Sequence, residues 1–237
     1  MQSIAERPRA ARPDVQPALV GQGELVAARA IALVLHGGQE KSVAPGAARH
    51  VAVLRMVPIA SRLAAAGASA GVAVWRLRFR YRGWNTDDAH PLADVHWAVQ
   101  QLRQRHGDVP IVLVGHSMGG RAALRAAGER GVVGVLGLAP WVPPGEPAEQ
   151  LAGRRLLVVH GTQDRITSAR ASRALVDTVR GEAAEATFIS LRHTGHAMLR
   201  RAALWHGLTA DFVMHAGLGV APGARLADAI ATGGGVL

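Results

Sequence analysis

Ile-Val-Leu-Val-Gly-His-Ser-Met-Gly-Gly is the sequence of residues 111–120, and the rest of the fold is organised around it. Its four leading apolar residues predict a buried strand, and a helical pattern begins directly after it. Between the two, Gly115, Ser117 and Gly119 occupy the spacing Gly-x-Ser-x-Gly. A serine at the apex of so sharp a turn leaves room only for small residues two positions before and after it. The segment therefore predicts a strand, a tight turn and a helix, with the serine hydroxyl held out at the carboxyl end of the strand.

The length and composition favour one sizeable α/β domain. Of the 237 residues, 49% are apolar, which is enough for a full core, and there is no cysteine. Disulfides, thiolate metal sites and a cysteine nucleophile are therefore excluded. The first residues lack the apolar core of a signal peptide, and we expect no stretch able to span a bilayer. On this basis a cytoplasmic protein is expected.

The formal net charge of +10 comes almost entirely from arginine, since Lys41 is the only lysine. The arginines are scattered along the chain and form no basic helix. We interpret them as solvated side chains, although they remain able to steer an anionic substrate. Binding to nucleic acid is not favoured, because no motif for it is present.

Apolar runs and helical periodicity alternate along most of the chain. Strands are predicted at residues 30–35, 70–78, 111–114, 132–138, 156–159 and 186–191, with an edge strand within 19–29; helices are predicted at 50–66, 91–106, 118–130, 168–179 and 197–215. This alternation predicts an α/β fold, with a mostly parallel, doubly wound sheet and helices on both faces. We expect a disordered arm at 1–17, a single domain at 18–216 and a flexible tail at 217–237.

The residues able to do chemistry follow different predicted strands at their carboxyl ends. They are the segment His36-Gly37-Gly38, then Ser117, then Asp164 and finally His196. In parallel sheets the site lies outside the carboxyl ends of the strands, so these loops are expected to converge. A serine hydroxyl needs a neutral imidazole to take its proton, and the imidazole needs a carboxylate to orient it. A tetrahedral oxyanion also needs preformed N–H donors.

Taken together, these segments resemble the α/β-hydrolase fold superfamily of serine hydrolases over residues 25–215. The chain order Ser117, Asp164, His196 is the order that this fold uses. The resemblance implies that Ser117 is the nucleophile, His196 the base and Asp164 its orienting acid. It also implies that the backbone N–H groups of Met118 and Gly38 form the oxyanion hole, with no metal and no cofactor. His36, His116 and His160 are expected to be structural.

Several acidic and basic residues compete for the same roles. His193 lies three residues before His196 and is the alternative base, although the glycine before His196 matches the family better. Asp87 and Asp88 follow a strand that comes too early in the chain for the acid. Glu146 stands where some lipases carry theirs.

The resemblance also indicates where a substrate pocket would lie and where this chain departs from its relatives. Gln39, Trp84 and Trp141 are candidates to line the pocket, whereas Trp205 is expected to pack in the core. Many relatives insert a helical cap after the strand that ends at Leu138, and here only a short proline-rich connection follows. The loop at residues 81–85 lacks the aspartate and second glycine typical of relatives that cleave monoacylglycerols. Little or no cap is therefore expected, and a lipase is not favoured.

The sequence thus predicts a serine hydrolase that cleaves a carboxylic ester through an acyl-serine intermediate. A thioesterase or acyltransferase acting on a carrier-bound acyl group would use the same residues, and a basic surface would suit an acidic carrier. A non-catalytic binding member of the fold is the third alternative.

Overall fold

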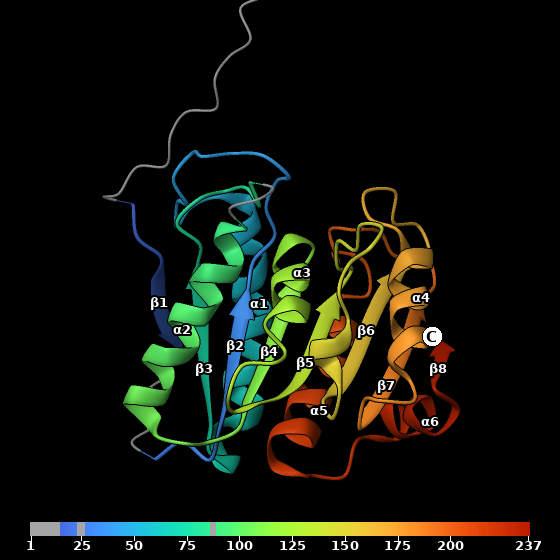
Figure 1. Cartoon of the computed structure of the whole chain (residues 1–237). Coiled ribbons are helices and arrows are strands. Elements are labelled where there is room, and N and C mark those ends of the chain that lie inside the picture. Colours follow the sequence, from blue (N-terminus) through green and yellow to red (C-terminus); the bar gives the residue numbers. More distant parts are fainter. Residues whose placement is uncertain (1–14, 23–26, 86–88) are drawn as a thin grey trace, which may run out of the picture.

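A computed structural model of the chain describes residues 15–22, 27–85 and 89–237, and within them one eight-stranded sheet forms the centre (Figure 1). The strand order is β1-β3-β2-β4-β5-β6-β7-β8. The bounds are β1 Ala18–Gln22, β2 Ala30–Leu35, β3 Val72–Arg78, β4 Ile111–His116, β5 Val132–Leu138, β6 Arg155–Gly161, β7 Glu185–Leu191 and β8 Gly234–Val236. Only β1 runs antiparallel to its neighbour. The expected α/β class with a mostly parallel sheet is confirmed.

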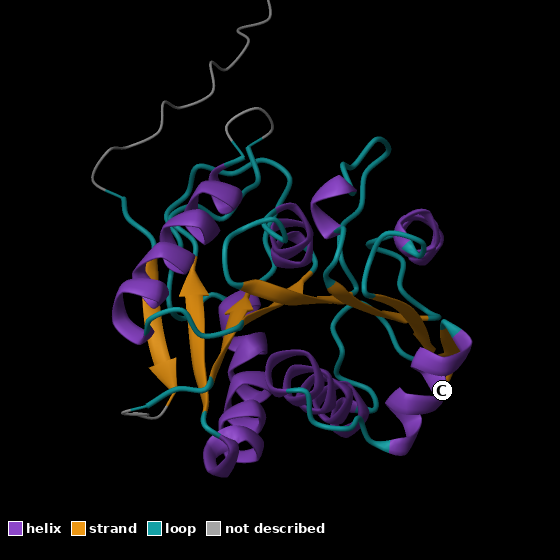
Figure 2. Ribbon diagram, turned by 60° about the horizontal axis from the view of Figure 1, so that its bottom comes forward, coloured by secondary structure: helices purple, strands orange, loops and turns teal. Residues whose placement is uncertain are grey.

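Helices cover both faces of the sheet, as the edge-on view shows (Figure 2). The helices are α1 Val51–Gly67, α2 His90–His106, α3 Met118–Arg125, α4 Ala169–Val179, α5 Ala202–Leu218 and α6 Ala224–Thr232, with short 3₁₀ turns η1 Ala68–Ala70 and η3 Glu149–Leu151. Side chains of α2, α3 and α4 join the core on one face, and those of α1, α5 and α6 join the core on the other. The central strands β2 and β4 are buried along their whole length, because helices pack on both of their faces.

The strand order reverses between β2 and β4. From β2 the chain moves outward to β3, then returns past β2 to β4 and continues in the opposite direction to β5, β6 and β7. Crossover helices leave on opposite sides at such a point, so the loops after the two strands separate and leave a crevice at the carboxyl edge. The loop that begins at His36 and the turn at Ser117 both start there.

The connection from β5 to β6 carries no helical cap. It runs from Ala139 to Arg154 and contains only the three-residue turn η3. The expectation of little or no cap is confirmed, and the carboxyl edge of β4 and β5 is left without a covering domain.

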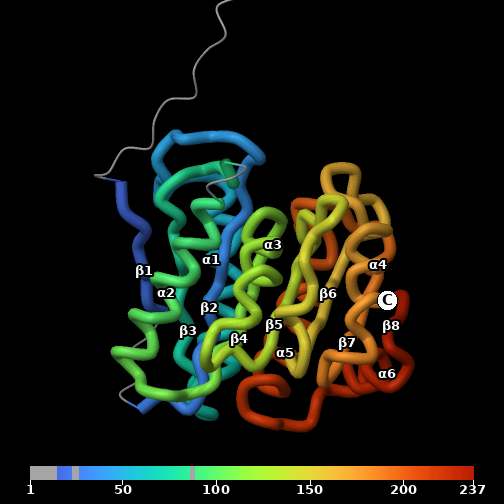
Figure 3. The backbone as a smooth tube through the Cα atoms, viewed as in Figure 1, coloured from blue at the N-terminus to red at the C-terminus, as the bar shows by residue number. Residues whose placement is uncertain are grey.

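The chain after Gly217 differs from the prediction of a flexible tail. It forms α6, whose Leu226 is fully buried, and then β8, which pairs in parallel with β7 (Figure 3). The tail prediction is wrong because Leu226 and Ala229 of α6 pack in the core of one sheet face and β8 pairs with the edge of β7, which the local sequence does not reveal. Of the predicted arm, residues 1–14 lie outside the described ranges, so that part of the domain division stays a prediction.

Two further expectations need correction. The final large helix begins at Ala202 and not near residue 197, because Met198 and Arg201 adopt positive φ angles in the turn before it. In addition, Val51–Ala70 is long and apolar enough to cross a membrane by length and composition alone, so the expectation that no such stretch exists is wrong. In the structure 33% of its most apolar part is buried, and α1 packs against β3 and α5.

Candidate active site

Ser117 sits at the apex of the turn between β4 and α3 in a strained backbone conformation. Its φ of 55° lies in the left-handed region that favours glycine, with a ψ of −117°. A Cβ added at Gly115 would overlap the backbone of Gly119, and one added at Gly119 would meet the carbonyl oxygen of His36 at 2.5 Å. The two glycines therefore allow the strained turn, as the Gly-x-Ser-x-Gly spacing predicts. The serine is buried, with 8% of its surface exposed.

The loop after β2 lies directly against this turn. A Cβ on Gly37 would lie 3.3 Å from the Cβ of Ser117, and a Cβ on Gly38 would overlap the thioether of Met118. Gly38 and Met118, the two residues predicted to supply the oxyanion donors, are therefore in contact. Only glycine fits at position 38, because the carbonyl oxygen of Arg82 also approaches it there.

Asp164 and His196, predicted from separate loops, are hydrogen-bonded to each other. The Nδ1 of His196 lies 2.8 Å from Oδ2 of Asp164. The carboxylate side chain is fully buried, whereas 14% of the imidazole is exposed. Since a carboxylate only accepts, the proton of the neutral imidazole resides on Nδ1 and its Nε2 is left as a base.

Two residues that sequence reasoning did not connect with the acid also bind it. The Nε2 of His160 lies 3.2 Å from Oδ2 of Asp164, and the hydroxyl of Thr167 lies 3.0 Å from the same oxygen. The other oxygen accepts the backbone N–H groups of Ile166 and Thr167 at 2.8 and 3.0 Å. The only sequence signal for Thr167 is its position three residues after an aspartate, which is typical of an Asx turn.

These contacts determine the charge of Asp164. Burial alone would raise the pKa of this carboxyl, but the hydrogen bonds from His160, His196 and the two backbone N–H groups outweigh it and hold the pKa well below its usual range. Asp164 is therefore ionised at neutral pH.

His116 links the serine turn to the loop that carries His196. Its Nε2 lies 2.9 Å from the backbone oxygen of His196, and the two rings lie 4.7 Å apart. Its Nδ1 is buried and has no hydrogen-bond partner among the described residues. Burial, and next the neighbouring His196, lower the pKa of His116 to about 3. It is therefore neutral, and it holds the loop of His196 beside Ser117.

His36 has a comparable structural position at the end of β2. Its Nε2 accepts the backbone N–H of Phe79 at 3.1 Å, and its Nδ1 donates to the oxygen of Gly37 at 2.6 Å. Burial is the largest cause that lowers its pKa, to about 4. The neutral ring therefore ties the loop of Gly37 and Gly38 to the end of β3.

The competing residues are placed elsewhere or lie outside the described ranges. Glu146 is paired with Arg121, whose Nε lies 2.8 Å from its Oε2. His193 is exposed, and its backbone donates to Thr162. Asp87 and Asp88 belong to residues that the structure does not describe.

The predicted pocket residues are near the serine turn, but they differ in how far they are exposed to solvent. Gln39 is exposed, Trp141 is partly buried, and only 3% of Trp84 is exposed. The backbone N–H of Trp141 donates to the oxygen of Ser117 at 3.0 Å. Trp205 is fully buried in the core, as expected.

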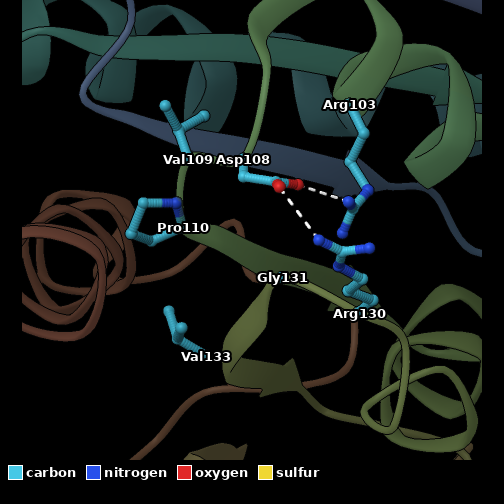
Figure 4. Close-up of a pocket in the computed structure, with 7 residues that line it drawn as sticks. All are labelled: Arg103, Asp108, Val109, Pro110, Arg130, Gly131 and Val133. Carbon is cyan, nitrogen blue, oxygen red and sulfur yellow. Dashed lines mark hydrogen bonds and ion pairs between the residues drawn. The ribbon is translucent and has the colours of Figure 1, made fainter.

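A separate pocket lies at the opposite, amino-terminal edge of β4 and β5 (Figure 4). There Asp108 bridges Arg103 and Arg130, and Val109, Pro110 and Val133 line the walls. Since the chemistry-bearing loops lie at the other edge, this pocket takes no part in the candidate site. Among the described residues no cluster of three or more metal-binding side chains occurs.

The chain matches the model of a known protein family. The model of the alpha/beta hydrolase family matches residues 32–157, more than half of the chain. No curated protein matches the sequence significantly.

Comparison with solved structures shows the same fold at low identity. An α/β serine hydrolase without lid from Xanthomonas campestris is 19% identical, with a TM-score of 0.55, over 87% of this chain and 97% of that chain. Esterase 2 of Thermogutta terrifontis, solved phosphonylated by cyclosarin, is 15% identical, with a TM-score of 0.65, over 90% and 94%. An α/β serine hydrolase homologue from Coxiella burnetii is 17% identical, with a TM-score of 0.60, over 82% and 89%. At such identities the similarity shows the fold alone.

Proposed function

Because this chain belongs to the alpha/beta hydrolase family, we propose that it is a serine hydrolase that cleaves a carboxylic ester through an acyl-Ser117 intermediate. The observation that carries the proposal is the 2.8 Å hydrogen bond between Nδ1 of His196 and Oδ2 of Asp164. This bond leaves Nε2 of His196 free to act as the base. The loop of His196 is held by His116, the residue before Ser117, because Nε2 of His116 lies 2.9 Å from the backbone oxygen of His196.

In the first step Nε2 of His196 takes the proton of the Ser117 hydroxyl while Oγ attacks the ester carbonyl carbon. The ionised Asp164 stabilises the imidazolium that forms, and such proton transfer contributes about 10² to 10⁴ in rate. The carbonyl oxygen becomes an oxyanion. The N–H groups of Met118 and Gly38 are the proposed donors to it, each worth about 10² to 10³.

Collapse of this intermediate breaks the bond to the leaving alcohol. His196 gives its proton to the alcohol oxygen, and the acyl group remains on Oγ of Ser117. In the second half, His196 takes a proton from a water molecule, whose oxygen attacks the acyl carbon. Release of the carboxylic acid then returns the proton to Oγ.

The absence of a helical cap between β5 and β6 supports an ester substrate that reaches the site directly from solution. A small molecule is the coarse substrate class that the hydrolase family implies, and a cytoplasmic location remains part of the proposal. A thioesterase or acyltransferase acting on a carrier-bound acyl group would use the same chemistry. Turnover of matched p-nitrophenyl esters and acyl thioesters distinguishes these alternatives.

A fluorophosphonate probe tests the nucleophile, because phosphonylation is the modification described for the Thermogutta terrifontis esterase. We expect labelling of the purified protein, identified at Ser117 by mass spectrometry, and none after Ser117→Ala. An alanine variant that labels and turns over like the parent protein would refute the proposal.

The base is tested by a pair of variants. We expect His196→Ala to lower ester turnover by several orders of magnitude. The matched control His193→Ala, in the same loop but away from Asp164, should have a mild effect. The opposite result would exchange the roles of the two histidines.

A further inference from the structure

The side chain of Arg121 packs into the corner formed by two tryptophans beside the proposed nucleophile. Its guanidinium carbon lies 4.0 Å from the ring centre of Trp84 and 4.6 Å from that of Trp141. The two rings meet edge to face, with centroids 6.2 Å apart. A guanidinium over an aromatic face is attracted by the ring electrons, and most strongly over tryptophan. We call Trp84, Arg121 and Trp141 the Trp–Arg–Trp cluster.

Two members of this cluster are attached directly to the serine turn. The backbone N–H groups of Arg121 and Trp141 both donate to the oxygen of Ser117, at 3.1 and 3.0 Å. Arg121 lies one helical turn after Ser117, and helical side chains lean toward the N-terminus of their helix. The guanidinium therefore extends back toward the level of the proposed nucleophile.

The third member is attached to the oxyanion loop. The backbone N–H of Trp84 donates at 2.9 Å to the oxygen of Gln39, the residue after Gly38. Trp84 is also nearly inaccessible, with 3% of its surface exposed. Its indole thus faces the arginine and not an open pocket.

The Trp–Arg–Trp cluster and the proposed base belong to opposite faces of the sheet. Trp84 and Trp141 pack with the core that α2, α3 and α4 cover. Met198, two residues after His196, packs in the core of the other face. Because His196 protonates the leaving alcohol, the alcohol must lie on the same side of Ser117 as His196. The acyl chain of a bound ester then extends away from His196, toward the Trp–Arg–Trp cluster.

Glu146 holds the arginine in place. Its carboxylate accepts Nε of Arg121 at 2.8 Å, its side chain is 1% exposed, and Arg125 lies 3.6 Å from its other oxygen. Displacing Arg121 would leave two tryptophan faces uncovered and a buried carboxylate without its closest cation. Breaking a buried pair in this way is strongly unfavourable.

We infer that the Trp–Arg–Trp cluster closes the acyl end of the site and restricts the enzyme to esters of short acyl chains. The inference rests on the proposed esterase function. Arg121 is a specificity-determining residue, because an acyl chain of more than a few carbons would have to displace a guanidinium that packs against two tryptophan rings and is fixed by Glu146.

The test compares acyl-chain preference in a double variant, Arg121→Ala with Glu146→Gln, which removes the side chain without leaving a buried charge unpaired. The matched control is Arg125→Ala, which also removes a cation near Glu146 but stacks on neither tryptophan. Substrates are p-nitrophenyl acetate, butyrate and octanoate. Each additional buried methylene is worth about fourfold. We therefore expect the octanoate-to-acetate ratio of kcat/KM to rise at least about tenfold in the double variant and to stay within about twofold in the control.

If Arg121 has only a structural role, the double variant lowers kcat/KM for all three esters by a similar factor. The octanoate-to-acetate ratio is then unchanged, and this result would overturn the inference. So would a parent protein that already prefers octanoate. Near-UV circular dichroism and Tm check the fold. If the double variant does not fold, Arg121→Met keeps an apolar stem against the two rings, and its octanoate-to-acetate ratio is expected to rise severalfold.

Calorimetric binding of octanoate separates this inference from the proposed function, because it needs no turnover. We expect the double variant to bind octanoate, and the parent and Arg125→Ala not to bind it measurably. Binding of equal strength by all three proteins would overturn the inference. A parent protein that hydrolyses no ester or thioester would overturn the proposed function, even where octanoate still binds only to the double variant.

Discussion

Lowering the pH from 7 to 5 should destabilise this protein through two buried histidines beside the candidate site. His36 and His116 are almost inaccessible, and burial is the main cause that lowers their pKa values from 6.5 to about 4 and about 3. The unfolded chain takes up a proton at each position as the pH falls through 6.5, whereas the folded protein does not. Folding stability therefore rises with pH in this range and is lost as the pH falls.

The size of the effect follows from the shifts. At pH 5 both histidines remain mostly neutral in the folded protein and mostly charged when unfolded. The difference from pH 7 is then about 1.5 pKa units for each, or about 2 kcal/mol each. The buried carboxyls Asp94 and Glu146 act in the opposite direction, because burial raises their pKa values. The total change in the parent protein is therefore a sum of opposing contributions, and single variants are needed to isolate each histidine.

The assay is urea unfolding at pH 7 and pH 5, followed by circular dichroism. Replacing His116 by Gln is expected to reduce the loss of unfolding free energy between pH 7 and pH 5 by about 2 kcal/mol. His36→Gln should do the same. A change in stability that is the same at both pH values cancels in this comparison. The control His193→Gln removes an exposed histidine from the neighbouring loop and should change the difference by less than about 0.5 kcal/mol. A His116→Gln protein with the same pH difference as the parent would refute the reasoning.

Three further predictions concern the site and the turn. Asp164→Asn is expected to lower kcat for the best ester about 10⁴-fold, because the tautomer of His196 is no longer enforced; Tm should be measured beside it, and a loss below tenfold would contradict the proposed role. Thr167→Val removes a hydroxyl that contacts both Asp164 and His196, so we expect a loss of about tenfold in kcat at unchanged KM; a change in KM alone would contradict this. Gly119→Ala places a Cβ 2.5 Å from the oxygen of His36 and should lower the free energy of unfolding by about 2 kcal/mol or more. Gly207→Ala in α5, where an added Cβ meets nothing within 4 Å, should instead be neutral or stabilising, and similar Tm losses in the two variants would contradict the steric explanation.

The α/β class and the order of the elements could be predicted from local sequence because each central strand carries its own signal. Ile31, Leu33 and Leu113 belong to continuous apolar runs that only a doubly covered strand explains, and Gly115 and Gly119 mark the turn by steric necessity. The last elements carried no comparable signal. The strand β8 contributes only three residues, and its stability depends on the edge of β7.

For the candidate site, the sequence determined the types of residue and their position at strand ends, since a serine, an acid, a base and glycines each need a defined chemistry. Which residues touch was decided by the tertiary structure. Contacts across tens of residues follow from the order of the strands, and that order brings Thr167 and His116 onto His196.

The tertiary structure also decides whether Trp84 and Trp141 line an open pocket or pack against another side chain. As a sequence, Trp84 and Trp141 are bulky side chains after two strands, and a pocket is a reasonable expectation. Folding brings Arg121 against both rings, because α3 begins at the turn of Ser117, and a charge held by a buried carboxylate then packs beside them. The sequence alone determined the fold class and the chemistry offered at the edge of the sheet. The space left for a substrate was decided only by the packing of side chains that are far apart in the chain.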